Sequence, residues 1–322
     1  MPIPHKMRGI TIFSGNAHPQ LAEEICQYLG IPLSPVHIQR FSNDCIQVQL
    51  LASCREADVF FIQPLCPPVQ ENLMELLQML DAAKGSAAAR LTAVIPHYAY
   101  ARSDKKDAPR ISIAGRLVAD LLKTAGADRV ITMTLHSPQV HGFFSVPVDH
   151  LNALVTLARY FKERGNLENT IVVSPDLGNA KSAAKFARLL KLPVAAGSKQ
   201  RLSDDRVVID DIVGDVEGKD IIVLDDEIAN GGTIIETLRC LRHRKARRLS
   251  VACTHGLFTG PAIERLGAQT DLEEIVTTNT VPVPLEKRLP NMRVLSIAPL
   301  LAEAIRRTHN GESISSMFEE EI

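Results

Sequence analysis

The apolar positions of the chain form short runs that are rich in β-branched residues. Such runs are typical of strands that are covered by helices on both faces of a sheet. Amphipathic stretches with a helical repeat lie between them. The pattern predicts strands over 59–62, 91–95, 130–133, 171–173, 221–224 and 249–253, and helices over 70–84, 112–124, 179–190 and 233–245. Strands that alternate with helices at this spacing predict an α/β protein with mainly parallel sheets.

The two halves of the chain share a weak internal repeat. Each half has an apolar run that starts with Asp, then a helical pattern, then a second run that starts with Arg. These pairs are Asp58 with Arg90 and Asp220 with Arg248. We interpret the repeat as two similar α/β domains, 1–150 and 151–322. The alternative is that any two segments of alternating strands and helices look alike.

Composition and charge exclude several classes of protein. A hydrophobic content of 45% is too high for a disordered chain. The 36 Lys and Arg residues balance 37 Asp and Glu residues, so no basic field favours a nucleic-acid partner. No apolar run reaches the ~18 residues of a membrane span, and the N-terminus lacks the apolar stretch of a signal peptide. The six cysteines form no CxxC pair, which favours reduced thiols in a cytoplasmic protein.

The segment 221–233 carries the strongest local chemical signal. A buried strand is predicted to end in Asp225 and Asp226, and Asn230-Gly231-Gly232-Thr233 then leads into a helix. Glycines let a backbone approach an anion, and a helix N-terminus offers N–H groups and a positive dipole to phosphate. The two carboxylates could hold ribose hydroxyls or a metal ion. The alternative is a capped turn with solvated acids.

Three further polar segments follow predicted strands. Arg102 opens a basic stretch whose side chains suit a polyphosphate, although a solvated charge run has the same composition. His136 could meet a metal ion or a phosphate, or act as a structural hydrogen bonder. Asp176 begins a second turn with glycine before a helix.

The segment 197–206 is polar, basic and unpatterned, as expected for either a mobile active-site loop or an exposed hairpin turn.

Segment 221–233 resembles the phosphate-binding loop of type I phosphoribosyltransferases, and the remaining motifs narrow the resemblance to the ribose-phosphate pyrophosphokinases. The motifs occur in matching order from about residue 8 to residue 318. They are RFSN at 40–43, YARSDKK at 100–106, MTLHS at 133–137, HGFF at 141–144, VDH at 148–150, VSPD at 173–176, NT at 279–280 and GES at 311–313.

The resemblance implies two phosphoribosyltransferase-like domains and a transfer of pyrophosphate from Mg-ATP to ribose 5-phosphate. It implies catalysis by Lys199 and Arg201, and Mg²⁺ at His136 and Asp176. The ATP-binding residues that it implies are Phe41, Asn43, Arg102, Ser103, Asp107 and His136. The ribose-5-phosphate residues are Asp225, Asp226, Ala229, Asn230, Gly231, Gly232 and Thr233. It further implies a homo-oligomer, a hexamer or its dimer building block, in which Phe41 and Asn43 serve a neighbour's ATP site.

The chain departs from the family pattern at three places. Ala229-Asn230 replaces Asp-Thr, which removes a carboxylate near the ribose, although Asn230 can still cap a helix or donate to phosphate. Ser103 replaces a longer Gln. Cys45 stands where a Glu often meets adenine. We expect these changes to alter nucleobase preference and affinity rather than the reaction.

Two alternatives to this function remain at the level of sequence. A phosphoribosyltransferase that consumes phosphoribosyl pyrophosphate has a similar turn, but the resemblance over the whole chain disfavours it. A silent regulatory homologue would have lost catalytic residues, whereas Lys199, Arg201, His136 and Asp176 are all present.

Overall fold

The computed structural model describes the backbone of residues 8–201 and 207–318. Side chains are described for these residues except 8, 199–201, 207–211, 316 and 318. The chain forms two compact units. Unit 1 runs to Leu151 and takes in the segment from Ala298, and unit 2 runs from Asn152 to Ile297. The predicted domain 151–322 therefore differs from unit 2 at its C-terminal end, because the last helix packs on a helix of unit 1.

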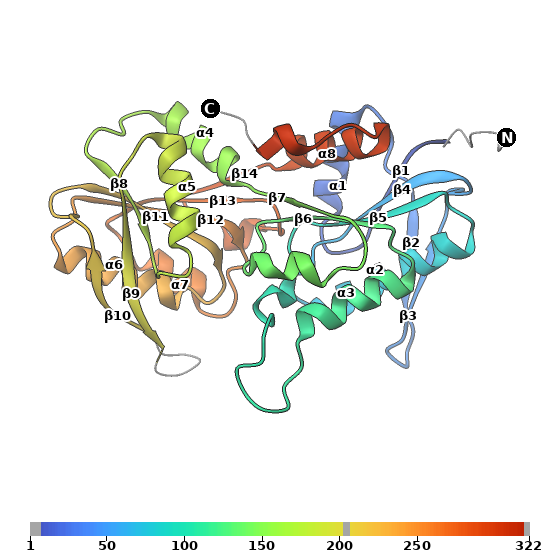
Figure 1. Ribbon diagram of the computed structural model, residues 1–322, viewed down its shortest axis with the longest axis horizontal. Helices are drawn as coiled ribbons and strands as arrows, with labels where there is room; N and C mark the ends of the chain where they lie inside the picture. The colour runs from blue at the N-terminus through green and yellow to red at the C-terminus, as the bar shows by residue number, and fades with distance from the viewer. Residues whose placement is uncertain (1–7, 202–206, 319–322) are drawn as a thin grey trace. The chain divides into compact units, whose positions relative to one another are not determined.

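Unit 1 is built on a parallel sheet of five strands in the order β1-β4-β5-β6-β7. The strands are β1 (Arg8–Ser14), β4 (Ala57–Ile62), β5 (Arg90–Ile95), β6 (Arg129–Met133) and β7 (Val148–Leu151). Helices α1 (Pro19–Leu29) and α8 (Ala298–Asn310) cover one face, and α2 (Val69–Gly85) and α3 (Ala114–Ala125) cover the other (Figure 1). All six residues of β4 are buried, which explains the continuous apolar run.

Shorter elements complete unit 1. The antiparallel hairpin of β2 (Val36–Arg40) and β3 (Ile46–Leu50) packs beside α2. Three 3₁₀ helices follow later in the chain: η1 (Ala99–Arg102), η2 (Pro138–Phe143) and η4 (Ser315–Phe318). None of the helices in the described ranges is long and apolar enough to cross a membrane.

A buried carboxylate joins the start of β4 to the C-terminal helix. Asp58 is fully buried and accepts two hydrogen bonds from Arg90, one of them from Nε at 2.8 Å. Arg90 Nη2 also donates to the carbonyl oxygen of Thr308 at 2.9 Å, and His309 Nδ1 lies 2.7 Å from Asp58 Oδ2. A buried carboxylate needs hydrogen-bonding partners in place of water. Because α8 supplies His309 as one of these partners, the helix belongs to the core of unit 1.

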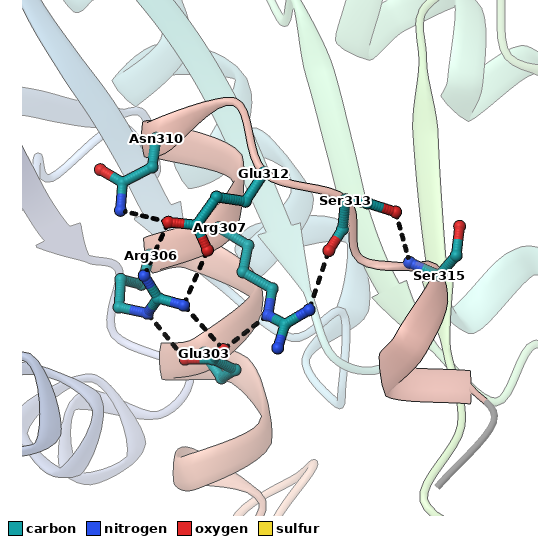
Figure 2. A network of polar contacts seen from close by, with 7 residues as sticks. All are labelled: Glu303, Arg306, Arg307, Asn310, Glu312, Ser313 and Ser315. Carbon is teal, nitrogen blue, oxygen red and sulfur yellow. Dashed lines mark hydrogen bonds and ion pairs between the residues drawn. The ribbon is translucent and has the colours of Figure 1, made fainter.

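A network of ion pairs fixes the segment that follows α8 (Figure 2). Arg306 bridges Glu303 and Glu312, and Arg307 bonds both Glu303 and the carbonyl oxygen of Ser313. Hydrogen bonds from Arg306 and Arg307 lower the pKa of Glu303 to about 2. The chain beyond the helix is therefore held against the last turns of α8.

Unit 2 is built on a sheet of seven strands in the order β10-β9-β8-β11-β12-β13-β14. The pairings are parallel except that of β9 with β10. The strands are β8 (Thr170–Ser174), β9 (Val194–Arg201), β10 (Val207–Val213), β11 (Asp220–Ile228), β12 (Arg248–Gly256), β13 (Leu272–Thr278) and β14 (Met292–Leu295). The helices are α4 (Leu154–Arg164), α5 (Ala180–Leu190), α6 (Gly232–His243), α7 (Ala262–Gly267) and the 3₁₀ helix η3 (Leu285–Lys287).

The central strand β11 contributes to two hydrophobic cores. Ile221 and Val223 face the core that holds residues of α6 and α7, whereas Ile222 and Leu224 face the core that holds residues of α4 and α5. Successive side chains of a strand point to opposite faces, so both faces of this sheet are covered. The α/β prediction is confirmed in both units.

The internal repeat has a structural counterpart. Asp58 lies opposite Arg90 in the β4–β5 register, and Asp220 lies opposite Arg248 in the β11–β12 register. Each pair forms an ion pair. In both sheets, an Asp near the start of one strand therefore pairs with the Arg that begins the neighbouring strand.

Candidate active site

The acidic pair of unit 2 lies within a strand rather than after it. The predicted strand over 221–224 was too short, because β11 continues to Ile228. Glu227 and Ile228 still pair with His255 and Gly256 of β12, which is nine residues long. Asp225 and Asp226 consequently belong to the last part of a paired strand, at the carboxyl edge of the sheet, where ligands of α/β proteins bind.

At this edge, the charges of Asp226 and Asp176 act on the carboxyl group of Asp225. Asp225 Oδ1 accepts a hydrogen bond from the backbone N–H of Asp226 at 2.9 Å. Burial raises the pKa of Asp225 well above its usual range, and the negative charges of Asp226 and Asp176 raise it further. Burial and the neighbouring carboxylates therefore oppose ionisation of Asp225, and a bound cation or hydroxyl donors would relieve that penalty.

The turn after β8 places Asp176 beside this pair. Its carboxylate accepts a hydrogen bond from the backbone N–H of Asn179 at 3.0 Å. The side-chain amide of Asn179 donates to the carbonyl oxygen of Leu224, also at 3.0 Å. Asn179 thus links the Asp176 turn to the residue before Asp225. This role of Asn179 has a single local signal in the sequence, a polar residue at the start of a predicted helix, and it was not predicted.

The glycine-rich turn leads from β11 into α6 as predicted. Gly231 has φ 77°, a left-handed conformation that favours glycine, and the helix begins at Gly232. Asn230 Oδ1 accepts a hydrogen bond from the N–H of Gly232 at 3.0 Å. Ala229 and Thr233 flank this turn and are partly buried. The backbone therefore has the shape of an anion-binding turn at a helix N-terminus.

In unit 1 the structure brings two predicted ATP-binding segments together. The side chain of Ser137, next to His136, donates a hydrogen bond to Asp104, two residues after Arg102. Arg102 and His136 are exposed, as is Asp107 farther along the same segment. His136 follows β6 and Asp176 follows β8 of the other unit, so their predicted sharing of a metal ion stays a prediction.

Ser103 has an internal role in the same segment. Its hydroxyl accepts a hydrogen bond from the N–H of Ala114 at 2.9 Å and donates to the carbonyl oxygen of Ser112 at 3.2 Å. Ser103 thereby links the Arg102 segment to the first residue of α3.

Phe41 and Asn43 lie on a different element of unit 1, the turn between β2 and β3. Phe41 is 41% exposed, and Asn43 Oδ1 accepts a hydrogen bond from the N–H of Cys45 at 3.2 Å. An ion pair between Arg40 and Glu71 holds the hairpin against α2. An exposed aromatic ring on an anchored hairpin is suited to stacking on a nucleobase.

The predicted catalytic residues lie on a strand. The interpretation of 197–206 as a loop is wrong for residues 197–201, since β9 runs to Arg201 and pairs with β10. Lys199 is opposite Ile209, and the register shifts between Ile209 and Asp211. Backbone hydrogen bonds form this pairing, so it needs no apolar pattern. The side chains of Lys199 and Arg201, and the rest of the predicted loop, lie outside the described residues.

Comparisons with known proteins cover almost the whole chain. Residues 10–126 match the family model described as the N-terminal domain of ribose phosphate pyrophosphokinase, and residues 201–319 match a phosphoribosyl synthetase-associated domain. A Streptomyces coelicolor protein is 63% identical over 97% of this chain and 98% of its own length. A Deinococcus radiodurans ribose-phosphate pyrophosphokinase is 50% identical over 96% of this chain and 98% of its own.

A solved structure agrees with these matches. The crystal structure of phosphoribosylpyrophosphate synthetase from Mycobacterium smegmatis superposes with a TM-score of 0.89 at 42% identity. The match covers 94% of this chain and 100% of that one.

Proposed function

The chain belongs to the ribose-phosphate pyrophosphokinase family, and we propose that the residues described above carry out the reaction of that family. The C1 hydroxyl oxygen of ribose 5-phosphate bonds to the β-phosphorus of Mg-ATP. The bond from that phosphorus to the α,β-bridging oxygen breaks, and the C1 hydroxyl loses its proton. The products are AMP, which keeps the bridging oxygen, and phosphoribosyl pyrophosphate. Such transfers depend on positioning and on neutralisation of charge.

We assign ribose 5-phosphate to the segment from Asp225 to Thr233. The observation that carries this assignment is the acidic pair directly before a glycine-rich turn at the start of α6. Carboxylates accept hydrogen bonds from ribose hydroxyls, and the turn offers N–H groups to the 5-phosphate. The predicted cytoplasmic location fits substrates of this kind.

The acidic edge of unit 2 fits a magnesium ion. In the part of the chain that the structure describes, no three His, Cys, Asp or Glu side chains are grouped to hold a metal by themselves. Mg²⁺ is commonly held by one or two carboxylates together with substrate phosphates and water. The crowded charge at Asp176 and Asp225 suits such a partner. Asp176 would contribute to holding the ion, which when bound neutralises polyphosphate charge, and the part of His136 stays a prediction.

We assign ATP to residues of unit 1. Arg102, Ser103, Asp107 and His136 belong to the two segments that meet through Asp104 and Ser137. A guanidinium there suits the triphosphate. Phe41 and Asn43 lie on the hairpin, and we propose that they contact the base of ATP bound to a second copy of the chain, within a homo-oligomer.

We further propose that Lys199 and Arg201 act on charge that develops as AMP departs. Interactions made only in the transition state lower kcat when removed and leave KM nearly unchanged. Loss of either cation is expected to lower kcat by roughly 10²–10³-fold.

The test measures AMP and phosphoribosyl pyrophosphate formed from ATP and ribose 5-phosphate by the purified chain, Lys199→Ala and Arg201→Ala. The wild-type chain should form both products in equal amounts and stop when the metal is chelated. Absence of product would contradict the function. A normal kcat with a large rise in KM for ATP would instead assign the two cations to binding.

A further inference from the structure

The glycine-rich turn after β11 is held from behind by one segment of unit 2, residues 258–265. Three consecutive carbonyl oxygens of the turn accept hydrogen bonds from it. The N–H of Phe258 donates to Ile228 at 3.0 Å, the N–H of Thr259 donates to Ala229 at 2.9 Å, and Arg265 Nη1 donates to Asn230 at 3.1 Å. We call residues 258–265 the backing segment.

These contacts fix the direction of the N–H groups of the turn. In a trans peptide the C=O and the following N–H point in opposite directions. Because the carbonyl oxygens of Ala229 and Asn230 face the backing segment, the N–H groups of Asn230 and Gly231 face away from it. An anion on that side meets donors rather than carbonyl oxygens.

The start of the backing segment is strained. Phe258 has φ 44°, which is costly for a bulky residue, and its side chain is 1% exposed. Its ring lies so close to Gly256 that a Cβ on that glycine would be 2.5 Å from a ring carbon. The buried ring thus keeps the backbone in the conformation from which Phe258 bonds the turn.

Arg265 differs from the other two contacts because it acts through its side chain. Its guanidinium also lies against the start of α6, where a Cβ on Gly232 would be 3.7 Å from Nη1. The side-chain oxygen of Asn230 accepts the N–H of Gly232, whereas its main-chain carbonyl oxygen accepts the hydrogen bond from Arg265.

We propose that Arg265 is a positioning residue for the 5-phosphate of ribose 5-phosphate. It holds the carbonyl oxygen of Asn230 away from the phosphate side, and it adds a positive charge next to the turn. The proposal rests on the assignment of ribose 5-phosphate to this turn, and it adds a residue from another helix, α7, to that site.

The experiment compares Arg265→Met and Arg265→Lys in the full chain. Loss of a hydrogen bond from a charged donor should raise KM for ribose 5-phosphate about tenfold in Arg265→Met. We expect kcat and KM for ATP to change less than about twofold, because the contact is the same in ground and transition states. Arg265→Lys, which keeps charge and donor, should restore most of the affinity. Calorimetry with ribose 5-phosphate should show the same order.

Two further variants make the result decisive. Arg239→Met removes an exposed arginine of α6 that pairs with Glu236, and it should change none of these values. Thr233→Ala tests the turn itself and should raise KM for ribose 5-phosphate. An unchanged KM in Arg265→Met overturns the proposal, as does an equal effect on ATP. If Thr233→Ala is also silent, the assignment of ribose 5-phosphate to this turn falls as well.

Discussion

Acidic side chains at the carboxyl edges of the two sheets have contrasting surroundings. At the edge of unit 1, the buried Glu75 of α2 accepts hydrogen bonds from the N–H and the side-chain amide of Asn16, at 2.9 and 2.8 Å. It also accepts one from Gln63 at 2.9 Å. At the edge of unit 2, Asp225 has other carboxylates beside it. Internal hydrogen bonds satisfy the carboxylate at the edge of unit 1, whereas burial and neighbouring carboxylates oppose ionisation of Asp225 at the edge of unit 2.

The internal hydrogen bonds at the edge of unit 1 also involve the turn after β1. Gln63 lies so close over this turn that a Cβ on Gly15 would be 2.4 Å from its side-chain oxygen. That oxygen also accepts the N–H of Ala17 at 3.2 Å. Donors that could bind a ligand are therefore used by the protein itself. A shared strand-turn-helix layout therefore does not make a binding site by itself, because the partners of its polar groups decide whether those groups stabilise the fold or bind a ligand.

The largest effect is expected when the carboxylate of Asp225 is neutralised. Asp225→Asn should lower turnover by roughly 10²–10³-fold, because it removes the carboxylate that we propose as the partner of the ribose hydroxyls. Burial and the neighbouring carboxylates raise the pKa of Asp225 in the folded chain, so ionisation of Asp225 opposes folding and the stability decreases as pH rises through that folded-state pKa. The variant should therefore unfold at an equal or higher denaturant concentration. Lower stability at pH 7 would contradict the comparison.

At the carboxyl edge of unit 1, a substitution should change stability rather than turnover. Glu75→Ala leaves the donors of Asn16 and Gln63 without their acceptor, and it should lower the free energy of unfolding by about 3 kcal/mol. Turnover per folded molecule should stay the same. Denaturant unfolding followed with an activity assay checks both, and Glu23→Ala, an exposed site on α1, is the control. A catalytic defect in folded Glu75→Ala would mean that this edge is also functional.

A smaller effect is expected at the amino edge of unit 2. Burial opposes ionisation of Asp220, but hydrogen bonds from Arg247 and Arg248 outweigh it and lower its pKa to about 2. Its stabilisation is complete above the unfolded-state pKa and is lost as pH falls toward 2. Asp220→Asn should thus cost about 2 kcal/mol at pH 7 and almost nothing near pH 2.

Urea titrations of Asp220→Asn at several pH values measure this difference. Asp215→Asn, at an exposed carboxylate paired with Lys219, should show a smaller change. Equal slopes with pH in the wild type and in Asp220→Asn would contradict the assignment.

The sequence predicted many of the strands and helices that depend on burial, although not β13 or α8, and it failed where backbone pairing or distant contacts decide. The runs at β4 and β11 were visible because both faces of each strand are covered. The end of β9 was missed because residues 197–201 have no apolar pattern, although their backbone pairs with β10. The hydrogen bond from Asn179 to Leu224 joins residues 45 positions apart, which no local pattern reveals.

The candidate site also combines residues of one segment with a residue from a distant part of the chain. Asp225, Asp226 and the glycine-rich turn were found because chemistry and local geometry coincide in one segment. Arg265 reaches the turn from 35 positions away, and neither its spacing nor its type marks it in the sequence.

The contact of Asp58 with His309 has a consequence for biosynthesis. Unit 1 is made from the beginning and the end of the chain, and all of unit 2 is translated between them. A ribosome releases the N-terminal part first, and domains generally fold as their residues emerge. The sheet of unit 1 must then wait for α8, with the carboxylate of Asp58 lacking one of its partners, while unit 2 is synthesised. A truncation within the last helix should therefore damage the unit that was synthesised first.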